Sequence, residues 1–151
     1  MNLRFEHSVP ASRDALFAFH EDPANLARLL EGWAGFELLE HGADIRPGSR
    51  TRLAQSLGPW MVAMTFEHEV LERPVRFAER QVSGPFARFV HVHTFTPDGD
   101  GTRVVDDVDF ASRGWLGGPL ADRLIVAPKL RRFFEFRRGA YARLCAAGAF
   151  R

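Results

Sequence analysis

The stretch from residue 87 to residue 110 reads ARFVHVHTFTPDGDGTRVVDDVDF. Apolar and polar residues alternate through 87–96 and again through 102–110, which is the period of a strand with one buried face. The residues between these two parts, Pro97-Asp98-Gly99-Asp100-Gly101, are of the types that form tight turns. The stretch therefore predicts a β-hairpin and, with it, an antiparallel sheet.

The chain on the N-terminal side of this hairpin shows the same alternation, interrupted by glycine and proline. It predicts one strand at the start of the chain, two short helices that end near Gly32, and then four more strands. The expected strands are 3–9, 35–40, 50–57, 60–72 and 75–82.

On the C-terminal side of the hairpin the pattern becomes helical. Large apolar residues recur at spacings of three and four between about Leu120 and Ala147, which predicts a long amphipathic helix. We expect Pro128 to kink or split it, so that the continuous helix begins near Lys129. The apolar stripe of this helix needs a partner, and the inner face of the sheet is the only large one available. The element order predicts an α+β fold.

Composition limits the class of protein. The chain has 151 residues, 46% of them hydrophobic and 26% charged, so we expect a single globular domain over 1–151. Its net charge of +1 argues against a nucleic-acid partner. No apolar run approaches the ~20 residues of a membrane span. The first residues lack the apolar core of an export signal, and Cys145 is the only cysteine, so we expect a cytoplasmic protein without disulfides.

Several short stretches along the whole chain also carry a resemblance. They are Val9-Pro10-Ala11, Phe17-Ala18-Phe19-His20, Asp22-Pro23-Ala24-Asn25-Leu26, Gln81-Val82-Ser83-Gly84-Pro85-Phe86, His91-Val92-His93-Thr94-Phe95, the segment from Gly101 to Asp106, and the Arg-rich last helix. On these stretches the chain resembles the START-like or helix-grip superfamily (Bet v 1-like, SRPBCC, polyketide cyclase/dehydrase and lipid transport), and most closely its bacterial SRPBCC proteins. The resemblance implies a curved seven-stranded antiparallel sheet wrapped around a long C-terminal helix. It also implies two short helices after the first strand and a cavity between sheet and helix.

Polar residues fall among large apolar ones on the inner face of the last three strands. Strand parity places Glu79 and Gln81 on that face, then His91 and His93, and finally Asp106. The expected turn positions set Glu79 opposite His91 and His93 opposite Asp106. By the same reasoning Gln81 faces Phe89.

This polar set has three interpretations. It is a satisfied buried network that binds at most one polar group of a ligand. Alternatively, Glu79, His91, His93 and Asp106 are catalytic, because a histidine oriented by a carboxylate moves protons near neutral pH. A third alternative is a metal site, because His-x-His on a strand points both imidazoles the same way and Glu79 or Asp106 adds an oxygen ligand. That pattern alone is weak evidence, and we expect neither a metal nor another cofactor.

The candidate ligand-binding residues share an expected position on the inner face of the sheet, on the inward stripe of the last helix, or in the glycine-rich connection before it. They are Trp60, Met64, Phe66, His68, Phe77, Gln81, Phe89, Phe95, Val108, Phe110, Trp115, Phe133, Arg137 and Tyr141.

The favoured function is binding of a small, mostly apolar or lipid-like molecule in the internal cavity, by a monomer or a homodimer. One alternative is a cofactor-free cyclase, dehydratase or isomerase that acts on a polyketide-like or aromatic substrate through a His–carboxylate pair. Another is a protein-interaction module with a closed core. An accessible cavity favours the first two of these, whereas a filled interior favours the third.

Overall fold

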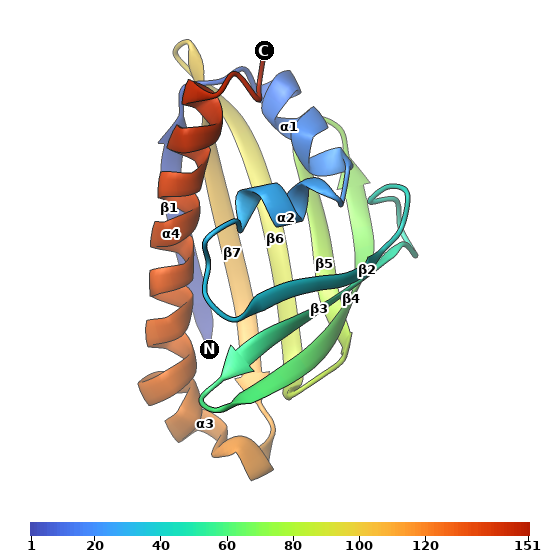
Figure 1. Ribbon diagram of the computed structural model, residues 1–151, viewed down its shortest axis with the longest axis vertical. Coiled ribbons are helices and arrows are strands. Elements are labelled where there is room, and N and C mark those ends of the chain that lie inside the picture. The colour runs from blue at the N-terminus through green and yellow to red at the C-terminus, as the bar shows by residue number, and fades with distance from the viewer.

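A computed structural model describes all 151 residues. Its centre is a seven-stranded antiparallel sheet with the strand order β1-β7-β6-β5-β4-β3-β2 (Figure 1). Hairpins join the strands from β2 to β7, and β1 pairs with β7 at the far edge. The strands are β1 (Asn2–Val9), β2 (Phe36–His41), β3 (Arg50–Leu57), β4 (Trp60–Glu72), β5 (Arg76–Ser83), β6 (Phe86–Asp98) and β7 (Gly101–Ser112).

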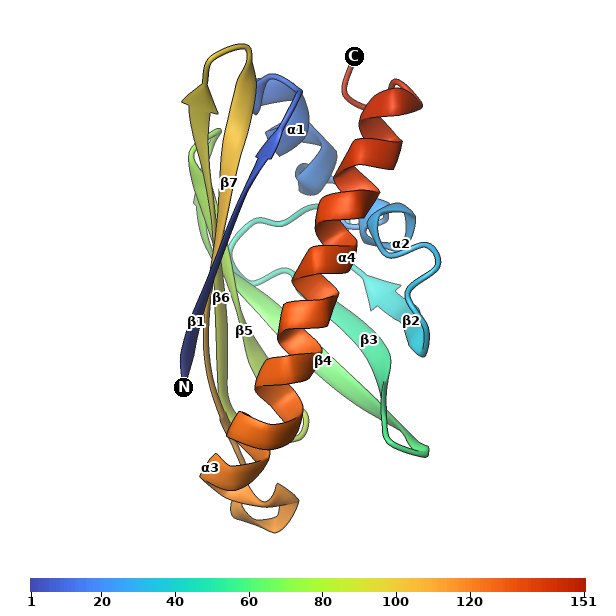
Figure 2. The same ribbon diagram turned by 90° about the vertical axis from the view of Figure 1, so that its left-hand side faces the viewer.

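The sheet curls around one long helix. Figure 2 shows α4 (Ala127–Ala146) against the concave side, with β1 and β7 on one side of it and β2 and β3 on the other. Two short helices, α1 (Arg13–Glu21) and α2 (Asn25–Leu29), follow β1 and cover the upper part of that concave side. The expected helix-grip architecture is confirmed. None of the helices has both the length and the apolar character that crossing a membrane requires.

The helical region before α4 differs from the expectation of a split at Pro128. A short helix, α3 (Gly118–Ala121), continues through a π-helical turn, Asp122–Val126, directly into α4. Pro128 lies in the first turn of α4, where a missing N–H is tolerated, and the wider π turn lies just before the ring. The helix therefore passes this proline without a break.

The strand register brings the polar residues of three strands together. Glu79 of β5 pairs with His91 of β6, and His93 pairs with Asp106 of β7, as the turn positions predict. The expected pairing of Gln81 with Phe89 is wrong, because the β5–β6 ladder ends at Arg80 and Val90. Gln81 instead donates to the backbone carbonyl of Phe86 and stabilises the turn between these strands.

Two apolar clusters pack between the sheet and the helices. The larger one joins α1 and the end of α4 to β5, β6 and β7, and the smaller one joins β6 and β7 to the start of α4. Phe95 belongs to the larger cluster, whereas Val108 and Phe110 belong to the smaller one. The core therefore has two apolar parts.

Candidate functional site

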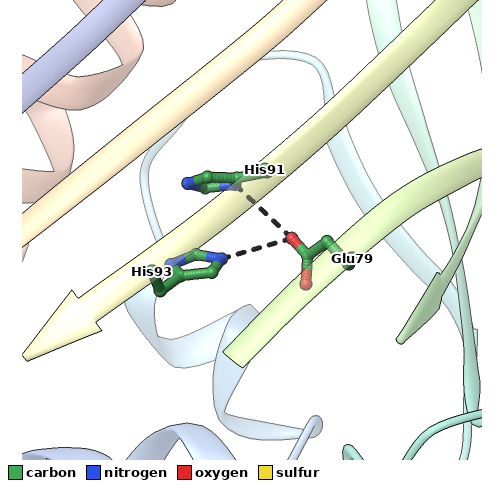
Figure 3. Close-up of side chains that lie close together, drawn as sticks. All are labelled: Glu79, His91 and His93. Carbon is green, nitrogen blue, oxygen red and sulfur yellow. Dashed lines mark hydrogen bonds and ion pairs between the residues drawn. The ribbon is translucent and has the colours of Figure 1, made fainter. Parts of the chain in front are cut away.

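Four side chains from neighbouring strands form a buried polar cluster: Glu79, His91, His93 and Asp106. Figure 3 shows both imidazoles directed toward Glu79. Oε1 of Glu79 lies 3.5 Å from Nδ1 of His91 and 3.4 Å from Nε2 of His93. Behind the rings, Oδ1 of Asp106 lies 2.8 Å from Nε2 of His91 and 2.9 Å from Nδ1 of His93. Each ring therefore lies between two carboxylate oxygens.

The helices α4 and α1 extend this cluster. Nη1 of Arg137 donates to Oδ1 of Asp106 at 3.3 Å, and Nη2 donates to the hydroxyl of Tyr141 at 2.9 Å. The same hydroxyl lies 2.7 Å from Nε2 of His20 on α1. A chain of polar contacts thus joins β7, α4 and α1, segments that are far apart in the sequence.

The carboxylates of the cluster and the basic groups beside them stabilise one another in their charged forms. Burial acts to raise the pKa of Asp106, but Arg137, His91 and His93 hold it well below the usual value. Burial likewise acts to raise the pKa of Glu79, and the contacts with His91 and His93 hold it well below the usual value. Burial acts to lower the pKa of His91, yet Asp106 and Glu79 raise it above 6.5. Both carboxyl groups are therefore ionised, and His91 accepts a proton readily.

Two other histidines beside the cluster have the opposite tendency. Burial, together with Arg137 and His93, holds the pKa of His20 well below 6.5. Burial also lowers the pKa of His68, whose Nδ1 lies 3.6 Å from Oε2 of Glu79. Neither ring nitrogen of His68 has a hydrogen-bond partner. A neutral imidazole with free polar atoms therefore lies beside the cluster.

A cavity of about 220 Å³ lies between the sheet, α2 and α4. Most of its wall is apolar and comes from α2, the strands β3 to β6 and the start of α4. The polar part of the wall includes His20, His68, Glu79, His91, His93 and Arg137. Asp106 does not reach this wall and is fully buried behind the two histidines.

Half of the candidate ligand-binding residues line the cavity. Trp60 and Trp115 do not, and these residues are 70% and 75% exposed. Phe95, Val108 and Phe110 fill the core. Gln81 binds the β5–β6 turn, and Tyr141 lies beneath Arg137. The candidates on the cavity wall are Met64, Phe66, His68, Phe77, Phe89, Phe133 and Arg137.

Several residues that line the cavity were not predicted from the sequence. His20 lies one helical turn after the buried Leu16, so its spacing already indicated an inward position. Gln55 and Lys129 gave no comparable signal, because each lies in a segment of mixed polarity. Gln55 accepts a hydrogen bond from the indole of Trp33, and Lys129 donates to the backbone carbonyl of Ser56. These contacts depend on how the hairpin β3–β4 curls toward α4.

The residue types in the cluster are also suited to binding a metal ion. Glu79, His91 and His93 each offer a ligand atom, and these atoms lie within 4.8 Å of one another. For proton transfer, the arrangement offers the carboxylates of Glu79 and Asp106, the readily protonated imidazole of His91 and the neutral imidazole of His68 on the cavity wall.

Solved structures from other organisms share this fold. Protein Ms6760 from Mycobacterium smegmatis is 18% identical with a TM-score of 0.74, over 97% of this chain and 92% of its own. TTHA0849 from Thermus thermophilus is 22% identical with a TM-score of 0.70, over 97% and 99%. The Zhui aromatase/cyclase from Streptomyces sp. R1128 is 20% identical with a TM-score of 0.73, over 93% and 90%.

Comparison by sequence is more specific about the family than the shared fold is. The chain matches no curated protein significantly. Residues 9–134 match the family model described as polyketide cyclase/dehydrase and lipid transport. That match covers most of the chain and includes the strands that carry the polar cluster. The chain therefore belongs to the polyketide cyclase/dehydrase and lipid transport family.

Proposed function

We propose that the protein binds a small, mostly apolar molecule in the cavity and holds one polar group of that molecule against the polar wall. The observation that carries this proposal is the cavity itself, which is predominantly apolar but has a polar wall on one side. Ligand sites in proteins combine these two features, since apolar contact supplies affinity and a few polar groups supply orientation.

The cavity volume limits the size of the ligand. An apolar cavity of about 150 Å³ is enough for benzene, and this one measures about 220 Å³. We infer a ligand built on one or two rings rather than a long lipid chain. The polar wall offers hydrogen-bond donors and acceptors from residues such as His68, Glu79 and Arg137, so a hydroxyl or carbonyl group is the polar function that suits this wall.

Filling the cavity provides the test. Leu130 of α4 lines the cavity. Leu124, in the π-helical turn just before α4, is exposed and does not line it. We expect wild-type protein to bind one equivalent of the apolar dye 1-anilinonaphthalene-8-sulfonate. Leu130→Trp weakens this binding at least tenfold, and the matched control Leu124→Trp leaves it unchanged. Equal dye affinity in all three proteins, each with native circular dichroism, contradicts the proposal.

A native mass spectrum of freshly purified protein supplies a second readout. A co-purifying organic molecule, released on denaturation, supports the proposal and identifies the chemical class of the ligand. Its retention by Leu124→Trp and loss from Leu130→Trp would assign it to the cavity.

A cofactor-free cyclase, dehydratase or isomerase acting on a polyketide-like or aromatic substrate is the second candidate. It is favoured by the neutral His68 on the cavity wall beside the ionised Glu79, because a histidine near a carboxylate is suited to general base catalysis. The aromatase/cyclase from Streptomyces shares the fold and so supports this candidate by analogy alone.

Deuterium exchange into a small 1,3-diketone tests the catalytic candidate. We expect the protein to accelerate the exchange, and both Glu79→Gln and His68→Gln to abolish the acceleration. Exchange at the uncatalysed rate with wild-type protein contradicts it. The closed-core interaction module receives no support from an interior with an unfilled cavity.

A further inference from the structure

The two imidazoles of the polar cluster lie between the carboxylates of Glu79 and Asp106. Each ring has a carboxylate oxygen near both of its nitrogens, which gives four nitrogen–oxygen contacts. A neutral imidazole carries one N–H and one lone pair. Two of these contacts are hydrogen bonds, from Nε2 of His91 to Asp106 and from Nε2 of His93 to Glu79, and two neutral rings supply the two N–H donors that they need.

The charges of the cluster are a separate observation. Asp106 is fully buried and Glu79 is partly buried, and Arg137 is the only permanent cation that contacts either carboxylate. With both rings neutral, one negative charge remains uncompensated in the protein interior. The cluster therefore favours an additional positive charge, either a proton on an imidazole or a bound cation.

The distances show where that charge fits. The contacts with Asp106 are 2.8 and 2.9 Å, the length of a charge-assisted N–H···O bond. The contacts with Glu79 are longer, at 3.5 and 3.4 Å. Atoms bound at ~2.0–2.1 Å to a tetrahedral ion lie ~3.3–3.4 Å from one another. Two of the three ligand–ligand distances on the Glu79 side are therefore close to those around an ion, and all three ligand atoms lie within 4.8 Å of one another.

We propose that Oε1 of Glu79, Nδ1 of His91 and Nε2 of His93 form a binding site for a divalent transition-metal ion such as Zn²⁺. Two histidines and one carboxylate are a common protein ligand set for this ion, with the remaining position open. All three side chains line the cavity, so the open position faces it. Water or an oxygen of a bound molecule completes the coordination there.

Asp106 has the role of an outer partner in this site. Histidines that bind a metal commonly donate their other ring N–H to a carboxylate, which sets the tautomer and the ring orientation. Here Nε2 of His91 is hydrogen-bonded to Asp106, and Nδ1 of His93 lies 2.9 Å from the same oxygen without hydrogen-bond alignment. Arg137 in turn positions Asp106.

Occupancy requires a small movement of the rings. Their centroids are 3.7 Å apart and their planes differ by 36°, whereas an ion lies in the plane of each ring that binds it. Rotation of one or both rings about χ2 makes the two lone pairs converge. This torsion is broad in histidine.

The experiment uses Zn²⁺ and Co²⁺ alone, with protein first treated with a chelator. We expect one equivalent of Co²⁺ to give the visible absorption bands of a four- or five-coordinate ion, and Zn²⁺ to displace it. Glu79→Gln keeps the side-chain shape, and His93→Gln replaces the imidazole with a polar side chain. Each should weaken binding at least as much as the ~10–100-fold loss typical of outer-partner changes. The matched control is His41→Gln, at an exposed histidine outside the cluster, and it should bind like wild type.

Wild-type protein alone gives an independent measurement in case a variant does not fold. Zn²⁺ should change the ¹⁵N shifts of Nδ1 of His91 and Nε2 of His93 and should raise the melting temperature. The proposal is overturned if wild type binds no stoichiometric metal. It is also overturned if the cluster variants bind as tightly as wild type, or if only His41→Gln loses binding.

This inference stands apart from the proposed ligand binding. The metal titration needs no apolar molecule, and the dye titration can be performed in chelator. A failure of one experiment therefore leaves the result of the other intact.

Discussion

The two sides of the cavity are built in different ways. The polar wall comes from β4, β5 and β6, with Arg137 of α4 and His20 of α1, and its groups other than His68 are linked by hydrogen bonds and ion pairs. The opposite end lies between the β3–β4 hairpin and the start of α4, where Leu57, Ile125 and Val126 line the cavity. Figure 1 shows that hairpin and α3 at the same end of the molecule.

Exposure separates the two sides further. His91 and His93 are buried, whereas Ile125 is 61% exposed although it lines the cavity. Other exposed apolar side chains, including Trp60 and Leu124, come from the same two segments. The histidines of the polar wall are thus buried, and we expect the cavity to reach solvent at the apolar end. Changes on the polar wall should therefore act on stability, and changes at the apolar end on access.

The largest effect is expected from Arg137→Met. This change leaves Asp106 as a buried carboxylate without its guanidinium, and breaking such a pair costs about 3–5 kcal/mol. Urea unfolding should show this loss. The matched control, Arg138→Met, removes an exposed neighbouring arginine and should change the free energy of unfolding by less than about 0.5 kcal/mol. Similar values for the two variants would show that Arg137 does not stabilise the polar wall.

Tyr141→Phe should have the next largest effect. Its hydroxyl accepts from Arg137 and contacts His20, so it links α4 to α1. Burial raises the pKa of this group to about 12, so the hydroxyl is protonated at neutral pH. Its removal should cost about 1–3 kcal/mol, because Arg137 stays buried and His20 stays partly buried without this hydroxyl.

The control for Tyr141→Phe is Ser8→Ala, which removes an exposed hydrogen bond to Asp98. It should cost less than about 0.5 kcal/mol in the same urea experiment. If Tyr141→Phe leaves the free energy of unfolding unchanged, the link between α4 and α1 contributes nothing to the stability of the polar wall.

A smaller effect, visible only as a pH dependence, is expected from His7, a buried histidine that neither side of the cavity uses. Burial lowers its pKa below 6.5, with Arg137 and Arg138 acting the same way and Asp106 and Glu135 opposing. The folded state therefore binds this proton less readily than the unfolded state does. The stability from neutral His7 is present above about pH 6.5 and is lost as the pH falls toward the folded pKa.

His7→Phe isolates this contribution, because it keeps a ring against Tyr141 and cannot titrate. Between pH 7 and pH 5, wild type should lose up to about 1.4 kcal/mol per pH unit relative to the variant. Parallel stability curves for wild type and His7→Phe would refute this assignment.

The smallest effect on stability, within about 0.5 kcal/mol, is expected from Ile125→Trp at the exposed end of the cavity. The larger side chain should narrow the opening and slow association of the dye several-fold in stopped-flow experiments. Leu120→Trp is the control, since Leu120 is exposed but does not line the cavity. Equal association rates would place the entrance elsewhere.

Much of the polar wall was predictable from residue order. Alternation places Glu79, His91, His93 and Asp106 on one face, and the turns set the pairs Glu79–His91 and His93–Asp106. The β5–β6 ladder ends before Gln81 because that side chain is used by the turn. A local pattern predicts the faces of strands well, because the side-chain period of a strand is two.

The apolar end was less predictable. Trp60 follows the parity of its strand, yet it is exposed because the β3–β4 hairpin extends beyond the helix that covers the rest of the sheet. Trp115 lies in a connection whose position no periodic pattern determines. Lys129 reaches Ser56 only because α4 passes close to that hairpin.

The sequence by itself determined the order of the elements, the inward face of each strand and the residues of the polar cluster, because these depend on local periodicity and turn chemistry. The tertiary structure alone decided that Arg137, Tyr141 and His20 complete the polar wall, and that a cavity of about 220 Å³ remains beside it. Those features depend on the curl of the sheet and the position of α4 across it. Both arise from packing between segments far apart in the chain.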